Sequence, residues 1–248
     1  MSSLGVLSSG LGGLLFLREL EKRQQGVGFV YWGDTASCPW GSRSFEWASG
    51  RAQEGVKFLE GRNVDTIVIA SGDSSVVIRS GGTKLRVPAV DMLESSVRAA
   101  LAVSKKKRVG IIGPRLVIER AGMLGLEQQG AVVLKKAIPA LAPLIIEGEE
   151  KRGEIRRLVR AHLQWFKSQN IDALILGSMY YIRVLDDIQA KMGKRVAVIH
   201  PAQALVASLM QQGEVRKGEQ RFYLTDVTPR DVDMTKEWLG RAVRPERA

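Results

Sequence analysis

The sequence has a single cysteine, Cys38, and only two histidines, His162 and His200, in 248 residues. One cysteine cannot form an internal disulfide, and it excludes a zinc or iron–sulfur site built from several thiolates. Two histidines far apart in the chain disfavour a histidine-built metal site, so we expect neither a metal nor a cofactor. No apolar run approaches the roughly 18 residues of a membrane-spanning helix. The first residues lack the basic segment and apolar core of a signal peptide, so we expect a cytoplasmic protein with no membrane partner.

Acidic residues are few beside the basic ones: 26 Asp and Glu against 37 Lys and Arg, a formal charge of +11. This surplus suggests a nucleic-acid partner. One basic cluster lies in a segment whose apolar residues recur at helical spacing, which leaves its arginines facing solvent. The apolar stripe consists of Ile155, Leu158, Val159, His162 and Phe166. The basic cluster consists of Lys151, Arg152, Arg156, Arg157 and Arg160. Net charge speaks to solubility and non-specific binding rather than to fold. The favoured interpretation is a solvated surface, with weak, non-specific nucleic-acid binding at most.

Short aliphatic runs alternate with helical patterns along the chain. Continuous apolar runs are typical of strands buried on both faces of a parallel sheet, and their alternation with helices predicts an α/β fold. The predicted strands are 4–8, 28–32, 66–70, 87–90, 108–112, 131–134, 173–176 and 195–199. Predicted helices include 14–24, 46–62 and 116–129. Thr228 followed by Pro229 predicts the start of the last helix.

The two halves of the chain repeat each other. Asp65 opens the run Asp-Thr-Ile-Val-Ile-Ala-Ser, and Asp172, 107 residues later, opens Asp-Ala-Leu-Ile-Leu-Gly-Ser. Two further pairs of segments, 5–7 with 110–112 and 87–90 with 196–199, recur at nearly the same offset. Several matches in one order indicate a duplication. We therefore expect two similar lobes, with mainly parallel sheets, facing each other across a cleft.

Polar residues follow the predicted strands. In open α/β sheets, ligands bind beyond the carboxyl ends of the strands. These positions are Ser8, Ser9, Asp34, Ser71, Asp91, Pro114, Ser178 and His200. The cleft would therefore offer mainly hydroxyl groups.

Several of these segments resemble the glutamate racemase family. Residues 5–13, Gly-Val-Leu-Ser-Ser-Gly-Leu-Gly-Gly, resemble its opening GVFDSGVGG, and residues 31–41 resemble YFGDTARVPYG. The segments 69–75 and 176–181 are similar to its two cysteine loops, ACNTAS and GCTHYP, and 221–225 to its RFYVT strand. The resemblance covers nearly the whole chain. It implies a two-lobed fold and cofactor-independent racemisation, in which two thiols on opposite faces of the substrate remove and return the α-proton.

The sequence departs from the family at the positions that the resemblance makes catalytic. Ser71 and Ser178 stand at the two cysteine positions, Ser8 at the assisting aspartate and Tyr180 at the assisting histidine. A serine hydroxyl is a far weaker acid than a thiol and needs an adjacent base to act. The resemblance therefore predicts a glutamate-racemase-like protein that has lost racemase activity, a pseudoenzyme with a binding or regulatory role.

The same resemblance predicts a ligand cleft, in which a small anion would bind, and a homodimer is a further expected partner. The cleft residues are Ser8, Ser9, Pro39, Trp40, Gly41, Ser71, Gly72, Asp73, Pro114, Ser178, Met179 and Tyr180. An alternative is an enzyme of altered chemistry in the Asp/Glu racemase superfamily, with Asp73, Tyr180 or His200 handling the proton. Another is a weak partner of nucleic acid or of a nucleic-acid enzyme. The expected first lobe is 1–95 plus 209–248, and the second is 96–208.

Overall fold

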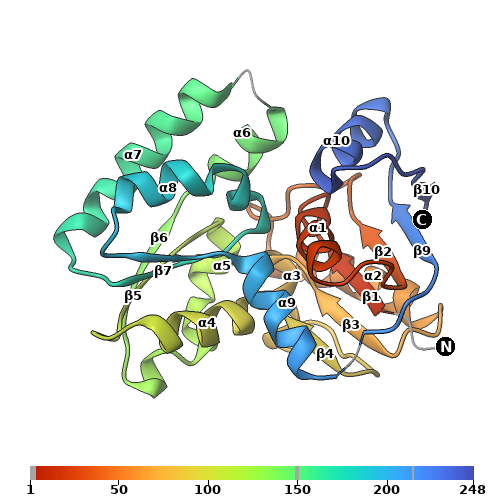
Figure 1. Cartoon of the computed structure of the whole chain (residues 1–248), viewed down its shortest axis with the longest axis horizontal. Coiled ribbons are helices and arrows are strands. Elements are labelled where there is room, and N and C mark those ends of the chain that lie inside the picture. The colour runs from red at the N-terminus through yellow and green to blue at the C-terminus, as the bar shows by residue number, and fades with distance from the viewer. Residues whose placement is uncertain (1–3, 149–150, 214) are drawn as a thin grey trace.

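The fold contains two sheets of parallel strands (Figure 1). The structure is a computed structural model that describes residues 4–148, 151–213 and 215–248. The first three residues, on which part of the signal-peptide interpretation depends, lie outside this range. The larger sheet has the order β10-β9-β2-β1-β3-β4, and the smaller has the order β6-β5-β7-β8. Every strand pair is parallel, as the continuous apolar runs predict.

The strands of the larger sheet are β1 (Leu4–Ser8), β2 (Phe29–Gly33), β3 (Thr66–Ile69), β4 (Ala89–Asp91), β9 (Gln220–Leu224) and β10 (Glu246–Arg247). Those of the smaller sheet are β5 (Arg108–Gly113), β6 (Val132–Ala137), β7 (Ala173–Leu176) and β8 (Ala197–Ile199). The helices are α1 (Gly13–Arg23), α2 (Phe45–Glu60), α3 (Gly72–Arg79), α4 (Met92–Val103), α5 (Arg115–Glu119), α6 (Leu141–Glu147), α7 (Arg152–Ser168), α8 (Leu185–Met192), α9 (Pro201–Gln211) and α10 (Pro229–Leu239). Short 3₁₀ helices include η1 (Ala121–Leu124), η2 (Glu127–Gln129) and η4 (Met179–Val184).

The duplication predicted from the sequence is confirmed by strand order. The run β2-β1-β3-β4 in one sheet has the same order as β6-β5-β7-β8 in the other, with β1 matching β5 and β3 matching β7. The larger sheet is then extended on one side, because β9, from the C-terminal part of the chain, pairs with β2. This β9 strand covers most of the segment that resembles the RFYVT strand.

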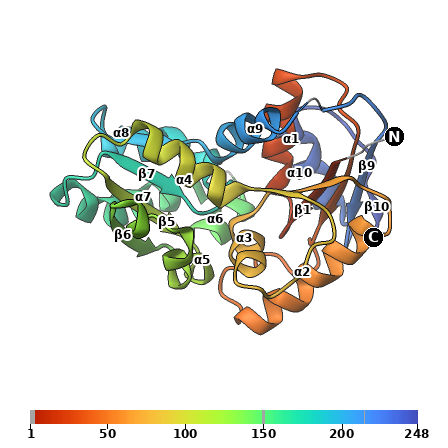
Figure 2. The same ribbon diagram turned by 90° about the horizontal axis from the view of Figure 1, so that it is seen from below.

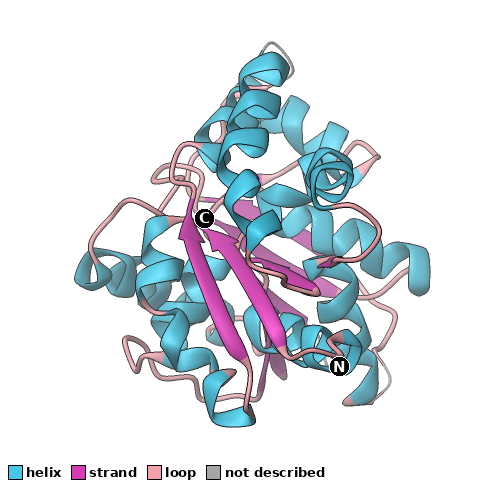
Figure 3. Cartoon of the chain, turned by 90° about the vertical axis from the view of Figure 1, so that its left-hand side faces the viewer, coloured by secondary structure: helices cyan, strands magenta, loops and turns pink. Residues whose placement is uncertain are grey.

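Helices cover the sheets, so the central strands are buried (Figure 3). The core is continuous from one sheet to the other, and its largest fully buried side chains include Trp32, Trp40, Tyr31 and Tyr181. Helix α9 contacts α1 from the first half of the chain and α4 from the middle of it (Figure 2). No helix in the described ranges is long and apolar enough to cross a membrane.

Side-chain caps fix where several helices begin. Ser71 accepts a hydrogen bond from the backbone N–H of Ser74 at the start of α3, and Asp91 caps α4 in the same way. Thr228 and Asp231 form a reciprocal capping box at α10, with Pro229 at the first helical position. The predicted start of the last helix is therefore confirmed, for the reason given by its sequence.

The helix predicted over 116–129 is wrong. Only α5 forms there, followed by the two short 3₁₀ helices η1 and η2. Gly125 and Gly130 have φ angles of 68° and 77°, in the left-handed region. An α-helix cannot pass through such residues, whereas glycine adopts this conformation readily.

The apolar stripe on α7 is largely confirmed, with two corrections. Ile155, Val159 and Phe166 are buried, and the predicted arginines are exposed. Leu163 is also buried, although the predicted stripe omits it. Leu158 and His162 are only half-buried because they lie at the margin of the stripe.

Candidate functional site

The predicted site residues lie where the strand order reverses in each sheet. In the larger sheet β1 lies between β2 and β3, so Ser8 at the end of β1 and Ser71 after β3 share one edge. In the smaller sheet Pro114 follows β5, and Ser178 lies two residues beyond β7. Such switch points are where ligands bind in open α/β sheets.

The two edges meet in direct backbone contact. A Cβ placed on Gly72, the residue after Ser71, would lie only 1.9 Å from the carbonyl oxygen of Gly177, the residue before Ser178. A Cβ on Gly41 would lie 2.3 Å from Cβ of Pro114. The backbone N–H of Leu116 also donates to the carbonyl of Gly41, at 3.1 Å. The structure thus holds the two edges together through residues that have no side chain.

All but one of the predicted cleft residues are buried in this arrangement. Ser8 is 1% exposed, Ser71 5%, Ser178 6% and Tyr180 5%. Ser9, Trp40, Gly41, Gly72, Asp73, Pro114 and Met179 are buried as well. Pro39 is half-buried. The structure brings residues of the predicted site from the two sheets into contact at Gly72 with Gly177 and at Gly41 with Pro114.

Among the described residues, neither serine at a cysteine position of the family has a base beside it. Ser71 Oγ donates to Ser74 Oγ at 2.7 Å and accepts from the Ser74 backbone N–H, so its hydroxyl serves as a helix cap. Within the described ranges, no carboxylate or imidazole hydrogen-bonds to Ser71 or Ser178. Ser8 Oγ accepts from the backbone N–H of Gly13 at 3.0 Å, which fixes the turn between β1 and α1.

Cys38 and Tyr180 come from different halves of the chain and meet at Gly10. Cys38 Sγ lies 3.0 Å from the hydroxyl of Tyr180. Gly10 has a φ of 147°, and a Cβ there would lie 2.3 Å from the Tyr180 hydroxyl and 2.5 Å from Cys38 Sγ. Burial raises the pKa of the Cys38 thiol to about 12, so the thiolate is not populated at neutral pH. Burial also raises the pKa of Tyr180 well above its usual value, so neither group is poised to transfer a proton.

Asp73 is a buried carboxyl group in the site. It is buried at the start of α3, and its Oδ1 has no hydrogen-bond partner. Burial raises its pKa to about 7, an effect that a hydrogen bond from Ser9 only partly opposes. At neutral pH this carboxyl group is therefore divided between its protonated and ionised forms.

A second cluster beside the site was missed by sequence reasoning. Asp34, which follows β2, is fully buried and accepts two hydrogen bonds from Arg51 on α2, at 2.7 and 2.8 Å. Trp40 Nε1 and Thr225 Oγ1 also donate to it, at 2.8 and 2.7 Å. This network ties Trp40, predicted to contact ligand, to the larger sheet. The sequence places Asp34 at a strand end, but Arg51 and Thr225 approach it from positions that no local pattern relates to it.

His200 forms a helix cap instead of joining a catalytic group. Its Nδ1 accepts from the backbone N–H of Gln203 at 3.3 Å, at the start of α9. Burial lowers the pKa of His200, and the negative charge of Glu19 on α1 partly opposes this shift. Within the described ranges, no hydrogen bond joins it to Ser178, and no three His, Cys, Asp or Glu side chains cluster to hold a metal.

Comparisons with known proteins point to one family. A family model described as Asp/Glu/Hydantoin racemase matches residues 18–209. A glutamate racemase from Aquifex pyrophilus is 34% identical over 241 residues, which cover 96% of this chain and 94% of that protein. The crystal structure of a glutamate racemase from Bacillus anthracis superposes with a TM-score of 0.91 at 26% identity, covering 100% of this chain and 97% of the other.

A glutamate racemase from Francisella tularensis, solved in complex with D-glutamate, has the same fold. Its TM-score is 0.86 at 24% identity, and the match covers 100% of this chain and 97% of that one. The two-lobed α/β architecture is thus shared along the entire length of the chain.

Proposed function

The chain belongs to the glutamate racemase family, and from that premise we propose that it is a racemase-like protein that does not racemise glutamate. The observation that carries this proposal is the replacement of thiols by hydroxyls. Ser71 and Ser178 stand at the positions that resemble the two cysteine loops, and the only thiol, Cys38, is half-buried beside Tyr180. The protein would act by binding a ligand or a partner.

The chemistry of the hydroxyl supports this proposal. A free thiol has a reference pKa of about 8.5 and supplies a thiolate readily, whereas an aliphatic hydroxyl requires a partner base. Ser71 donates to another serine, and the described part of the chain places no base beside Ser178. Neither serine would then be able to remove the α-proton of a bound amino acid.

The charge and packing of the site also support the proposal. Ionised Asp73 would repel the carboxylates of glutamate in a space from which water is excluded. Contacts between Gly72 and Gly177 and between Gly41 and Pro114 would have to separate before any ligand could enter. A small anion at the predicted cleft residues would therefore require the two edges to part.

The proposal is tested by incubating L-glutamate with the protein and following the optical rotation of the solution, which falls as D-glutamate forms. The Aquifex pyrophilus glutamate racemase serves as the positive control, and a Ser71→Ala/Ser178→Ala variant gives the background. We expect the wild-type protein to match this background. Formation of D-glutamate well above the background, and lost in the variant, would refute the proposal.

A second candidate is an enzyme of altered chemistry, favoured by one observation. Asp73 is a buried carboxyl group with an unpartnered oxygen and a pKa near neutrality, which are properties of a general base. A panel of uncharged amino acids and hydantoins in deuterated water tests this candidate. Proton exchange that disappears in Asp73→Asn would favour it over the binding protein.

A further inference from the structure

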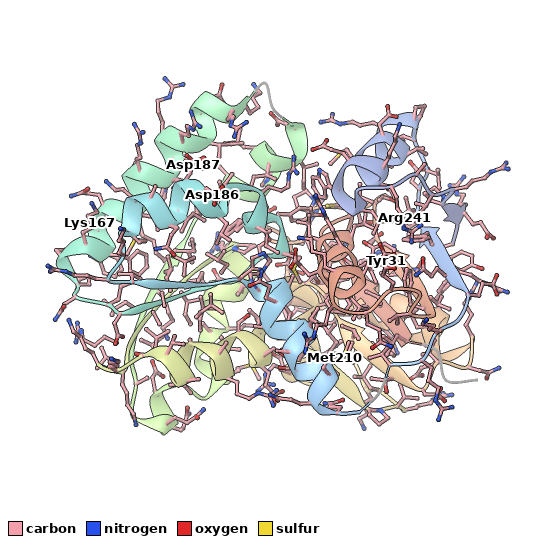
Figure 4. All side chains as sticks on the ribbon, in the orientation of Figure 1. Tyr31, Lys167, Asp186, Asp187, Met210 and Arg241 are labelled. Atoms are coloured by element: carbon pink, nitrogen blue, oxygen red, sulfur yellow. The ribbon has the colours of Figure 1, made fainter. Side chains whose placement is uncertain are left out.

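A basic groove lies between α7 and α8, away from the candidate site. Its volume is about 200 Å³, and it is lined by Arg156, Val159, Arg160, Lys167, Asp187, Ala190 and Lys191. Four of these seven residues are cationic and one is acidic. Figure 4 labels Lys167 on α7 and Asp187 on α8, which mark the two walls of the groove.

Two of the four cations have no partner among the residues that the structure describes. Arg156 pairs with Asp187 at 3.2 Å, and Lys191 Nζ donates to Gln164 at 2.6 Å. In the described part of the chain, Arg160 and Lys167 form neither a hydrogen bond nor an ion pair, and both are exposed. The single carboxylate in the groove is already occupied, so the groove keeps a net positive charge that is available to an anion.

The cations on α7 form a straight row. Arg156, Arg160 and Lys167 are spaced so that they lie on nearly the same side of the helix, over about 16 Å at 1.5 Å per residue. The buried stripe of α7 lies about a quarter-turn around the helix from this row, and the row itself is exposed. A rigid row of separate charges matches a chain of repeated phosphates better than it matches one phosphate, which would contact only part of it.

We propose that the α7–α8 groove binds the phosphate backbone of duplex nucleic acid, without reading its sequence. The groove contains no aromatic side chain on which an unpaired base could stack, which favours a duplex over a single strand. The overall charge of +11 adds long-range attraction. This site is separate from the racemase-like site, so the proposal stands whether or not the protein is a pseudoenzyme.

The test measures fluorescence anisotropy of two unrelated labelled 20-bp duplexes between 50 and 200 mM NaCl. We expect a Kd of about 10⁻⁴–10⁻⁶ M near physiological salt for both duplexes, because phosphate contacts alone give this range. With three or four neutralised phosphates, log K should fall with log salt at a slope of about −3.

A triple variant, Arg156→Glu/Arg160→Glu/Lys167→Glu, should weaken binding at least tenfold and flatten the slope. The matched control, Arg23→Glu/Lys84→Glu/Arg244→Glu, loses the same total charge at exposed positions outside the groove and should weaken binding less than threefold. The triple variant places a new carboxylate opposite Asp187, and this like-charge pair can destabilise the fold. The variant Arg160→Gln/Lys167→Gln, which adds no negative charge, is therefore measured as well. Thermal melting is recorded for every variant. The Gln variant should weaken binding at least threefold without lowering the melting temperature.

Equal losses in the groove and control variants would overturn the proposal, because overall charge alone would then explain binding. Unchanged binding in the Gln variant would overturn it too. A duplex preference that persists at high salt would indicate base reading and contradict the proposal. So would displacement by inorganic phosphate beyond that of sodium chloride at equal ionic strength, which would indicate a site for a single phosphate.

Discussion

Asp73 couples the stability of the closed site to pH. The folded state raises its pKa to about 7, while an unfolded aspartate titrates near 3.9. Between these values the folded protein holds a proton that the unfolded chain has released. The contribution of Asp73 is therefore fully present below about pH 4, is lost as the pH rises toward 7, and is absent above it. The charge of ionised Asp73 in turn helps to raise the pKa values of Cys38 and Tyr181, which stay neutral over this range.

Replacing Asp73 by asparagine should remove this dependence. The free energy of unfolding of the variant, relative to wild type, should increase by up to about 1.4 kcal/mol per pH unit between pH 4 and 7 and then level off. Urea denaturation at intervals from pH 4 to 8.5 measures the difference. A constant difference across this range would show that Asp73 is not buried as described.

Cys38 should react slowly with iodoacetamide at pH 8. Its pKa of about 12 leaves roughly a thousandth of the thiolate that a free cysteine has at this pH. The control is Cys38→Ser/Ala36→Cys, which moves the thiol to an exposed position two residues away. The control should react about a thousandfold faster, and denaturant should abolish the difference. Equal rates in the folded proteins would mean that Cys38 is not enclosed by Tyr180 and Gly10.

The roles of several site residues could not be predicted from the sequence. Ser8 and Ser71 were recognised as strand-end positions, but their work as turn and helix caps depends on donors whose placement the fold decides. The four hydrogen bonds to Asp34 come from three residues in separate segments, Trp40, Arg51 and Thr225, and pairing of this kind leaves no periodic signal. The pKa of Asp73 similarly depends on burial by the other half of the chain.

Between secondary-structure elements, close contacts of backbone with backbone hold the two edges of the site together. The start of α3 touches the residue that follows β7 because Gly72 carries no side chain. Substituting Gly72→Ala should lower the free energy of unfolding by roughly 1–3 kcal/mol, because the new methyl group overlaps a backbone carbonyl that cannot rotate away.

Gly50→Ala is the matched control for this change. Gly50 also lies in a helix, α2, but a Cβ there would meet nothing within 4 Å. This substitution should raise the free energy of unfolding by up to about 1 kcal/mol, since alanine favours the helix. Urea denaturation of both variants measures the contrast. If the Gly72→Ala variant has an unchanged free energy of unfolding and unchanged Cys38 reactivity, the close contact between Gly72 and the Gly177 carbonyl is contradicted.

Elements were predicted well where burial and periodicity agree, and poorly where glycine interrupts them. The aliphatic runs gave all eight strands of the duplicated sheets, with small shifts at their ends. The segment 116–129 has helical spacing, but Gly125 within it and Gly130 after it adopt left-handed conformations that spacing alone does not reveal. β10, only two residues long, forms because β9 offers it an edge, which no local pattern could indicate.

At the scale of the whole molecule, the strand order repeats and the C-terminal strand β9 returns to the larger sheet. These features support the proposed lobes, 1–95 plus 209–248 and 96–208. The duplication could be predicted from the spacing of similar runs. The closed contact between the two edges could not, because it depends on how two rigid sheets meet.

The proposed loss of activity depends on the whole site and not only on the two missing sulfur atoms. Ser71→Cys with Ser178→Cys should therefore fail to restore glutamate racemisation, because Asp73, Met179 and Tyr180 still occupy the surrounding positions and catalytic groups act as a unit. The optical assay measures turnover, and thiol titration of the unfolded variant confirms both new cysteines. Substantial turnover would show that the substrate pocket had survived and only the thiols had been lost.

The most direct test is exchange of the α-proton of glutamate with deuterium from the solvent. Mass spectrometry of L- and D-glutamate incubated with the protein in deuterated water detects proton removal from either face, even when no racemisation follows. The account predicts exchange no faster than without protein, while the Aquifex pyrophilus racemase exchanges both isomers. Exchange well above the protein-free control, and abolished in Ser71→Ala/Ser178→Ala, would contradict it.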